Sequence, residues 1–506
     1  GLEATTAAGG DPMNATRGPA ILVLAAMTAA AAALSSGPVE VSGAEARPEA
    51  RAATTLDSSS TALWFCTGPT AELDGIDERT VEVVGISASP TEGRVTVVDE
   101  AGRAVERAFR IDPGDRLRIS PGQFVSGAMF AGVTVEVSGG AAVVGQTVAG
   151  PDGADRRPCT TRASDTWVVP WSTTARPGNR AWVLLHNPFR AAAVADLRFV
   201  GDIGRRETLD SQGVVVPGRS IVAYDVTERI ADSAVVSATI DVRVGRVVVT
   251  RLQASDGSGP LATRGLDLAP GVPELATRAF IPGVGTGAVS TGSPGAGTSV
   301  VVVNTGVEAV EAEVVVRTGE EVTGLEPWRL VLRAGQRHVV DLDAGRLEGA
   351  DAFGVEVRTL DGRPIAASVV QRFGGDGVSE ASSSVEGGLA VRPAAVVAAR
   401  GWVVDLNDRY GATADVLAVM NPASEGIATI EVKVLAGTAP AGVARSVELA
   451  PGTQVSFDLA GGPPAVLAVE STAPVIVSIH SRTGEGATAS FAVAVAGTEA
   501  RPVPSN

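Results

Sequence analysis

The chain has 506 residues, a formal net charge of −16, 45% hydrophobic residues and only 4% aromatic residues. This length suggests about three to five domains, whose cores must be built from Val, Ala and Leu because aromatic side chains are scarce. The acidic balance excludes a basic binding stripe, so we expect no nucleic-acid partner. With 60 Gly and 30 Pro, the composition favours many turns and short strands over long helices.

Residues 1–19 show no hydrophobic pattern and are expected to be disordered. Residues 20–38 contain the apolar run Ala20–Leu34, preceded by Arg17 and followed by the cleavage candidate Ala44-Glu45-Ala46. This pattern is typical of a signal peptide or an N-terminal membrane anchor, and both interpretations stay open. Either predicts an exported protein, extracellular or in the cell envelope, that contacts the membrane if the segment is uncleaved. Residues 39–61 are predicted to be a flexible spacer.

The rest of the chain repeats itself. Three asparagines that close apolar runs lie 117 residues apart (304 − 187 and 421 − 304): Asn187, Asn304 and Asn421. Three turn glycines keep the same spacing: Gly218, Gly335 and Gly452. A repeat of this length is a whole small domain, because solenoid units and propeller blades span roughly 20–50 residues. We interpret each asparagine as the start of an Asx turn that leads into the next strand.

These patterns predict an all-β fold of tandem immunoglobulin-like β-sandwich domains behind an N-terminal signal or anchor helix. In the second domain we expect strands at about 166–170, 180–186, 194–200, 213–217, 219–226, 234–244 and 246–254. The last two strands of each copy are predicted to form a hairpin. The expected β-sandwiches cover 62–162, 163–276, 277–398 and 399–498, followed by a disordered tail at 499–506.

One aromatic residue stands at the head of each expected first strand: Trp64, Trp167, Phe280 and Trp402. The two cysteines, Cys66 and Cys159, both lie in the first domain, without a CxxC motif or a neighbouring histidine cluster. We expect them to form a disulfide, which would stabilise the divergent first domain by about 4–5 kcal/mol in the chain-entropy model.

The residues that could carry chemistry all have a simpler structural interpretation. His186 aligns through the repeat with Val303 and Met420, which indicates a packed strand position, and His338 and His480 fall in other strands. Ser258 lies in a Gly-rich turn that lacks the strand-to-helix setting of a catalytic serine. The glycines of 283–297 precede no helix that could cradle a phosphate.

Acidic residues offer a weak calcium signal. Asp341 with Asp343, and Asp405 with Asp408 around Asn407, could supply the oxygen ligands of an extracellular Ca²⁺ site. Because Asp341 recurs as Asp225 and Asp458, a turn or strand-end role is the simpler explanation. We predict no catalytic residue, no metal site and no bound cofactor.

The order of an N-terminal export segment, the Trp64-Phe65-Cys66 motif and Val/Ala/Gly-rich β-structure resembles an uncharacterised family of actinobacterial exported proteins. The resemblance covers about residues 60–498 and implies a cell-envelope location without catalytic residues. We therefore expect a non-enzymatic scaffold that binds an envelope protein and supports a complex that assembles surface polysaccharide. The alternatives are a glycan-binding or adhesive protein, with Tyr410, Trp328 and Trp171 as candidate contacts, and a secreted hydrolase with an unrecognised site.

Overall fold

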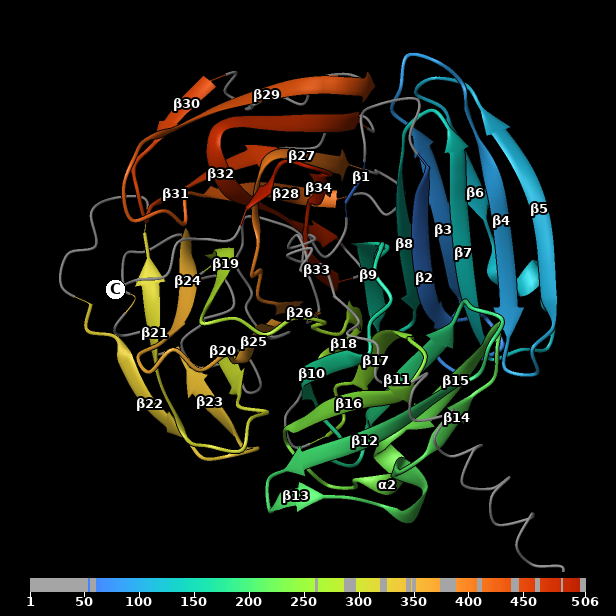
Figure 1. The fold of residues 1–506 in the computed structure, drawn as a ribbon, viewed down its shortest axis with the longest axis horizontal. Helices are drawn as coiled ribbons and strands as arrows, with labels where there is room; N and C mark the ends of the chain where they lie inside the picture. Colours follow the sequence, from blue (N-terminus) through green and yellow to red (C-terminus); the bar gives the residue numbers. More distant parts are fainter. Residues whose placement is uncertain are drawn as a thin grey trace, which may run out of the picture. The chain divides into compact units, whose positions relative to one another are not determined.

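A computed structural model describes residues 53–54, 61–259, 263–285, 297–318, 325–342, 347, 352–373, 388–406, 412–437, 446–459, 465–483 and 486–500. The chain divides into two compact units, Gly1–Arg47 and Pro48–Asn506, and all of these residues belong to the second. They form an all-β fold with many small antiparallel sheets (Figure 1). Within this part of the chain, no helix has the length and hydropathy that crossing a membrane requires. The predicted signal or anchor segment lies outside the described residues.

The strands group into four sets, which we call modules 1 to 4. Module 1 contains two four-stranded sheets, β2-β7-β4-β5 and β6-β3-β8-β9, around one apolar core. Its elements are β2 (Ala62–Pro69), β3 (Glu78–Gly85), β4 (Thr91–Asp99), β5 (Ala104–Ile111), β6 (Arg116–Ile119), η1 (Pro121–Gln123), β7 (Phe130–Gly139), β8 (Ala142–Gly150) and β9 (Gly153–Pro158).

Module 2 repeats this plan with the sheets β10-β16-β12-β13, to which β14 adds at β12, and β15-β11-β17-β18. Its elements are β10 (Thr166–Ser172), β11 (Asn179–Asn187), β12 (Ala193–Gly201), β13 (Gly204–Arg206), η2 (Leu209–Ser211), β14 (Val214–Val216), β15 (Ser220–Asp225), α2 (Val226–Arg229), β16 (Val236–Val244), β17 (Val248–Asp256) and β18 (Arg264–Pro270). All seven strands expected here are present, and β13 and β18 are strands that the sequence reasoning missed.

Module 3 has the sheets β19-β24-β21-β22 and β23-β20-β25-β26. Its strands are β19 (Arg278–Gly285), β20 (Gly297–Val303), β21 (Val310–Arg317), β22 (Trp328–Leu332), β23 (Arg337–Asp341), β24 (Ala352–Thr359), β25 (Ala366–Phe373) and β26 (Gly388–Pro393).

Module 4 differs because one long strand, β32, serves both of its sheets. β32 pairs with β27 and β29 along its first half and with β28 and β33 along its second half. The strands are β27 (Ala398–Leu406), β28 (Ala412–Met420), β29 (Ala428–Gly437), β30 (Ser446–Leu449), β31 (Gln454–Leu459), β32 (Ala465–Thr483), β33 (Gly486–Phe491), β34 (Val493–Val495) and β35 (Glu499–Ala500).

The predicted hairpin of the last two long strands is wrong. In module 2, β16 pairs with β10 and β12 in one sheet, whereas β17 pairs with β11 and β18 in the other. The short connection between β16 and β17 therefore carries the chain from one sheet to the other. Both sheets pack on the same core, so a tight turn joins strands of opposite layers.

The chain ends of the described unit also differ from expectation. Ala53–Thr54, inside the predicted spacer, form β1 and pair in parallel with β34. Glu499 and Ala500, inside the predicted disordered tail, form β35 and pair with Ala399 and Ala398 of β27. Both segments add strands to the first sheet of module 4.

A central strand in the second sheet of each of modules 1, 2 and 3 is buried on both faces. β12 of a first sheet alternates between buried and partly exposed residues, as a strand with one covered face does. By contrast, nearly every residue of β3, β11 and β20 is buried. Such strands read as continuous apolar runs because their second face also packs against protein. That second face meets the neighbouring module.

Contacts between modules close a cycle. Separate apolar clusters join module 1 to module 2, module 2 to module 3, and module 3 to module 4. The core of module 1 in turn includes Val403, Val466 and Val493 of module 4. The four modules of the described unit are therefore not a string with free ends.

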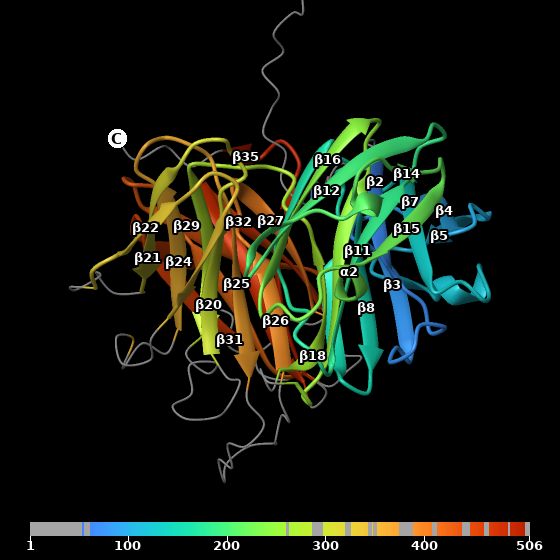
Figure 2. The same ribbon diagram turned by 90° about the horizontal axis from the view of Figure 1, so that it is seen from below.

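The last strands of the four second sheets, β9, β18, β26 and β33, pack against one another at the centre of this cycle (Figure 1). We call them the inner strands, and Figure 2 also shows β18 beside β26. Each would otherwise be the free edge of its sheet, and an uncovered edge invites pairing with other chains. Closure of the cycle covers all four of these edges.

Candidate functional site

The inner strands share a short sequence pattern that positions the central side chains. Each has Gly at its first aligned position and a ring-bearing residue five positions later: Gly153 and Pro158, Gly265 and Pro270, Gly388 and Pro393, Gly486 and Phe491. Between these ends, the third position holds Asp155, Asp267, Ala390 or Thr488, and the fifth holds Arg157, Ala269, Arg392 or Ser490. Charged residues of different modules therefore meet at one place.

Asp267 of β18 links three modules. Its carboxylate accepts hydrogen bonds from Arg157 Nη2 of module 1 at 2.5 Å, from Arg251 Nη2 of its own module, and from the backbone N–H of Val391 in module 3 at 2.7 Å. The Asp267 side chain has no exposed surface, and those of Arg157 and Arg251 have at most 3%. A buried carboxylate persists only when its charge is paired and hydrogen-bonded, as it is here.

Asp155 of β9 forms the complementary link. It accepts hydrogen bonds from Arg157 Nε at 2.7 Å, from the Leu268 N–H of module 2 at 2.7 Å and from the Thr488 hydroxyl of module 4 at 2.6 Å. Together, Asp155 and Asp267 contact all four modules. We call Asp155, Arg157, Arg251, Asp267 and Arg392 the central cluster.

Arg392 completes the central cluster from β26. Its Nη1 donates to His480 Nε2 at 2.6 Å, and its guanidinium lies 5.8 Å from the ring centroid of Phe491. Burial, reinforced by the charge of Arg157, lowers the pKa of Arg392 to about 9 and, in the same way, that of Arg251 to about 9. Arg392 and Arg251 are therefore still cationic at neutral pH. With Arg157, the central cluster holds three formal positive charges against two negative charges.

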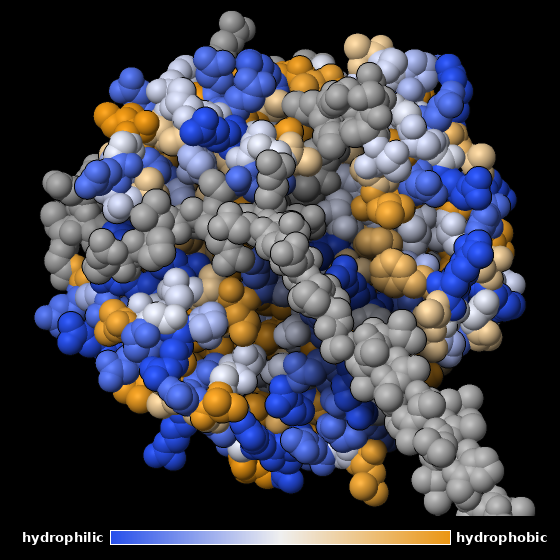
Figure 3. Space-filling model, in the orientation of Figure 1, coloured by the Kyte–Doolittle hydropathy of each residue, from blue (hydrophilic) through white to orange (hydrophobic). Residues whose placement is uncertain are grey.

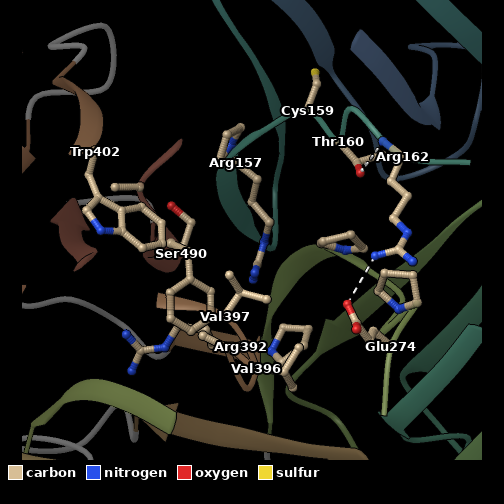
Figure 4. A pocket seen from close by; sticks show the side chains of 17 residues that line it. Arg157, Cys159, Thr160, Arg162, Glu274, Arg392, Val396, Val397, Trp402 and Ser490 are labelled. Atoms are coloured by element: carbon tan, nitrogen blue, oxygen red, sulfur yellow. Dashed lines mark hydrogen bonds and ion pairs between the residues drawn. The ribbon is translucent and has the colours of Figure 1, made fainter. Parts of the chain in front are cut away.

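A cavity opens beside the central cluster, where the inner strands end (Figure 4). The volume open to the centre of a water molecule is about 60 Å³. Its lining combines apolar side chains with two central arginines: Arg157, Pro158, Cys159, Thr160, Arg162, Pro270, Pro273, Glu274, Arg392, Pro393, Ala395, Val396, Val397, Trp402, Ser490, Phe491 and Ala492. Glu274 is the one carboxylate of this lining, and Arg162 Nη1 pairs with it at 3.1 Å.

A second cavity lies on the side of modules 1 and 4. It shares Arg157 and Ser490 with the first and is lined by Asp405 of β27. Arg116 Nη2 of module 1 pairs with Asp405 at 2.7 Å. Neither of the two cavities combines unpaired carboxylates.

The predicted disulfide between Cys66 and Cys159 is present, and the two cysteines are 93 positions apart in sequence. It fastens β2 to the segment that follows β9, and Cys159 contributes to the lining of the first cavity. Both cysteines are buried. The disulfide therefore holds the first inner strand against the core of its own module.

The three repeated asparagines have equivalent surroundings. The Oδ1 atoms of Asn187, Asn304 and Asn421 accept a hydrogen bond from the backbone N–H two residues later, which is the Asx turn. Their Nδ2 groups donate to one carbonyl in the same loop and to another at the end of the neighbouring strand. All three side chains are buried, and they join two strands within each module.

The repeated glycines are less regular than their spacing suggests. Gly335 and Gly452 adopt positive φ angles of +60° and +69°. In module 2 this conformation belongs to Arg219, with φ +54°, and not to Gly218. Gly218 is required for a different reason, because a Cβ there would lie 1.9 Å from the Arg190 carbonyl oxygen. Module 2 contains one additional residue before this turn, because Val216 lies 29 positions after the asparagine that binds its carbonyl, whereas the equivalent Leu332 lies 28 positions after Asn304. The sequence alignment of the turn therefore slips by one position.

The aromatic residues in the first strands of the modules also differ by one position in module 3. Trp167 Nε1 donates to the Val247 carbonyl and Trp402 Nε1 to the Val475 carbonyl, both at 2.9 Å, from inside their module cores. In module 3 the core position belongs to Ala279, and Phe280 faces the interface with module 4. A one-residue shift moves a strand side chain to the opposite face, so Phe280 is not the equivalent of the tryptophans.

The histidines lie apart. His186 is fully buried between modules 1 and 2, where Thr67 Oγ1 is 3.3 Å from its Nδ1 and a Cβ at Gly132 would meet its ring. Burial, helped by the charge of Arg79, lowers the pKa of His186 to about 3, so the ring is neutral. His338 is exposed on β23, and His480 contacts Arg392.

The remaining candidates form no site in the described part of the chain. Ser258 is exposed and donates both its N–H and its hydroxyl to Asp256 within a turn. Asp341 accepts a hydrogen bond from Ser299, while Asp343, Asn407, Asp408 and most of the 283–297 loop lie outside the described residues. No group of three His, Cys, Asp or Glu side chains that could hold a metal ion occurs among the residues described.

The aromatic residues suggested for glycan contact are not gathered on one surface. Trp171 is buried against the guanidinium of Arg251. Trp328 on β22 is partly buried against the module 3 core, and Tyr410 lies outside the described residues. Sequence reasoning named these residues but missed the central cluster. The shared pattern of the inner strands, Gly with Pro or Phe five positions later, could have revealed the central cluster. Because the segments between the four copies differ in length, this pattern does not recur at a constant spacing.

The fold and the central cluster define an all-β protein of multiple small antiparallel sheets stapled by one disulfide. Residues 136–326 match the model of a family of unknown function, DUF5719. The matched stretch begins in β7 and includes the whole of module 2. No curated protein matches the chain.

Proposed function

We propose that this protein is a non-enzymatic, exported cell-envelope scaffold whose four modules are immunoglobulin-like β-sandwiches. The observation that carries the proposal is the joint linkage of all four modules by Asp155 and Asp267. The buried carboxylates that could otherwise act as catalytic groups are hydrogen-bonded between modules and hold them together. The outer sheets and loops are then left to contact a partner.

The immunoglobulin-like assignment is supported by two antiparallel sheets around one core in about 100 residues, a typical size for this sandwich. Export is supported by the apolar segment at residues 20–38 and by the disulfide, since disulfides persist in oxidising compartments. The resemblance to actinobacterial exported proteins agrees with an envelope location. On this basis the scaffold would support a complex that builds surface polysaccharide.

A protein partner is favoured over a glycan by the surface of the described unit. Single apolar side chains such as Ile203 and Val307 stand exposed on loops, and Leu209 stands exposed at the start of η2. Figure 3 shows apolar side chains in small groups among hydrophilic ones on this face. The chain's formal charge of −16 favours a partner with a basic surface, whose binding weakens as salt rises.

An enzymatic function has less support. Glycoside hydrolysis requires two carboxyl groups facing one substrate. The two cavities present Glu274 and Asp405, one in each, and an arginine neutralises each of them.

The test is purification of the tagged full chain from cross-linked cells that naturally produce it, with mass spectrometry of bound proteins. We expect the chain in the envelope fraction, with its cysteines oxidised, and cross-linked to an envelope protein. Without cross-linking, the same complex should dissociate at high salt. Recovery with reduced cysteines in the cytoplasmic fraction would contradict export. Tight binding to purified surface polysaccharide without a protein partner would replace the proposal with glycan binding, and hydrolysis of that polysaccharide would replace it with an enzyme.

A further inference from the structure

The cavity beside the central cluster has one polar and one apolar side. Figure 4 shows the Arg157 guanidinium directed into it, with Trp402, Val396 and Val397 among the labelled residues around it. Pro158, Pro270, Pro393 and Phe491, the ends of the four inner strands, complete the apolar wall. Concave sites of this kind, mainly apolar with a few fixed polar groups, are where proteins hold small molecules.

Arg157 retains hydrogen-bonding capacity toward the cavity. Its Nε donates to Asp155 and its Nη2 to Asp267, whereas no acceptor among the described residues pairs with Nη1. The side chain is only 3% exposed, so bulk water does not solvate it as it would a surface arginine. A buried guanidinium with an unused N–H pair is suited to donate hydrogen bonds to a carboxylate oxygen.

The local charge favours an anion. The central cluster carries one formal positive charge in excess, because it contains three arginines and two aspartates. Arg157 and Arg251 pair with the two aspartates, whereas Arg392 contacts His480. Glu274, the carboxylate of the lining, is already paired with Arg162. An entering carboxylate would therefore balance the excess charge.

The size of the cavity restricts the ligand. A volume of about 60 Å³ open to water centres corresponds to roughly four water molecules, at about 15 Å³ each in this measure. Long chains and sugars do not fit this space. A single ring or a short branched chain does.

We propose that this cavity binds a small monocarboxylate with a compact apolar body. The carboxylate pairs with Arg157 Nη1, and the body packs against Trp402, Phe491 and the prolines of the inner strands. This site goes beyond the scaffold function and does not depend on the identity of the partner protein.

The test uses the purified full chain with benzoate as the probe and benzamide as its neutral counterpart of the same shape. Saturation-transfer NMR titrations measure the affinity for each. We expect benzoate to bind at least fivefold more tightly than benzamide, because only the carboxylate balances the positive charge. No binding of benzoate, or equal binding of both, would overturn the proposal.

Ser490→Leu locates the site. Ser490 lines the cavity, and its position on the inner strands is occupied by arginine in modules 1 and 3, so a larger side chain is compatible with the strand. Leucine should fill the cavity and weaken benzoate binding at least tenfold, whereas the control Ser138→Leu, at an exposed position of β7, should leave it unchanged. Equal benzoate affinity in both variants would contradict the assignment. If Ser490→Leu fails to fold, crystals of the wild-type chain soaked in 4-bromobenzoate decide: anomalous signal beside Arg157 supports the site, and signal only elsewhere refutes it.

Discussion

The Thr488 hydroxyl donates a 2.6 Å hydrogen bond to the Asp155 carboxylate, although the two residues are 333 positions apart in sequence. This contact joins the last inner strand to the first and so closes the cycle of modules. The Arg156 N–H and carbonyl also meet the same hydroxyl, at 3.2 and 2.9 Å. One threonine hydroxyl therefore contacts three polar groups of module 1, accepting from the N–H and sharing its proton between the two oxygens.

The central ion pairs should be essential to stability. Asp267→Asn removes the charge that Arg157 and Arg251 share inside the protein, and breaking a buried pair in this way costs about 3–5 kcal/mol. The control is Asp241→Asn on β16, which removes an exposed ion pair with Arg198 of β12 and should cost less than about 1 kcal/mol. Urea unfolding of both variants measures the difference. Similar midpoints for the two would show that the central cluster contributes little.

The repeated asparagine should matter for structure and not for binding. Asn304→Ala leaves the Gly306 N–H and the Glu308 and Leu332 carbonyls without their side-chain partner, which should cost about 2–3 kcal/mol. Asn304→Asp keeps the acceptor but faces a carboxylate toward carbonyl oxygens, so we expect a loss at least as large. Thermal unfolding of the full chain tests both. A wild-type midpoint in the alanine variant would refute the role.

The one-residue difference in module 2 predicts different effects of alanine at two equivalent turn positions, Gly452 and Arg219. Gly452→Ala places a Cβ at φ +69°, where the left-handed conformation costs about 1–2 kcal/mol. Arg219→Ala changes a residue that already bears this strain, so we expect a change within about 0.5 kcal/mol. Its exposed ion pair with Glu106, at 3.5 Å, adds little. Denaturant midpoints give the comparison, and equal losses at both positions would contradict the structural alignment.

The buried His186 should make stability depend on pH. Its pKa is about 3 in the folded protein against 6.5 in the unfolded chain, so the unfolded chain binds more protons between these values. Stability contributed by the neutral ring is present above pH 6.5 and is lost as pH falls toward 3, by about 2 kcal/mol between pH 7.5 and pH 5.

His186→Met removes this titration and introduces the residue found at the equivalent position of module 4, Met420. We expect the variant to lose about 2 kcal/mol less than the wild type between pH 7.5 and pH 5. Urea unfolding at both pH values measures this, with His338 and His480 common to both proteins. Parallel pH curves would show that His186 does not titrate as proposed.

Local sequence patterns were sufficient for the elements and for several contacts within a module. The apolar runs that end at Asn187, Asn304 and Asn421 indicated both a repeat and an Asx turn, because that turn depends on residues two positions apart. The strands of module 2 and the Cys66–Cys159 disulfide were also predictable, from alternation and from the presence of only two cysteines.

The sequence-based predictions failed for two reasons. Either one residue was inserted or shifted relative to the other repeats, or the position was determined by a contact with a strand distant in sequence. Arg219 takes the conformation expected at a glycine, and Ala279 takes the core place expected for Phe280, since an inserted or shifted residue reverses the face of a strand. The continuous valines of β20 held a clue to burial on both faces, but they could not identify the covering surface.

Composition and periodicity thus determined an all-β chain with repeated turns, because strands and turns arise from neighbouring residues. Only the tertiary structure decided that the modules close into a cycle with Asp155 and Asp267 at its centre. Most hydrogen-bond donors to those carboxylates are arginines, amides and a hydroxyl from other modules. Contacts between residues more than a hundred positions apart produce no periodic pattern in the sequence, so the sequence alone could not predict them.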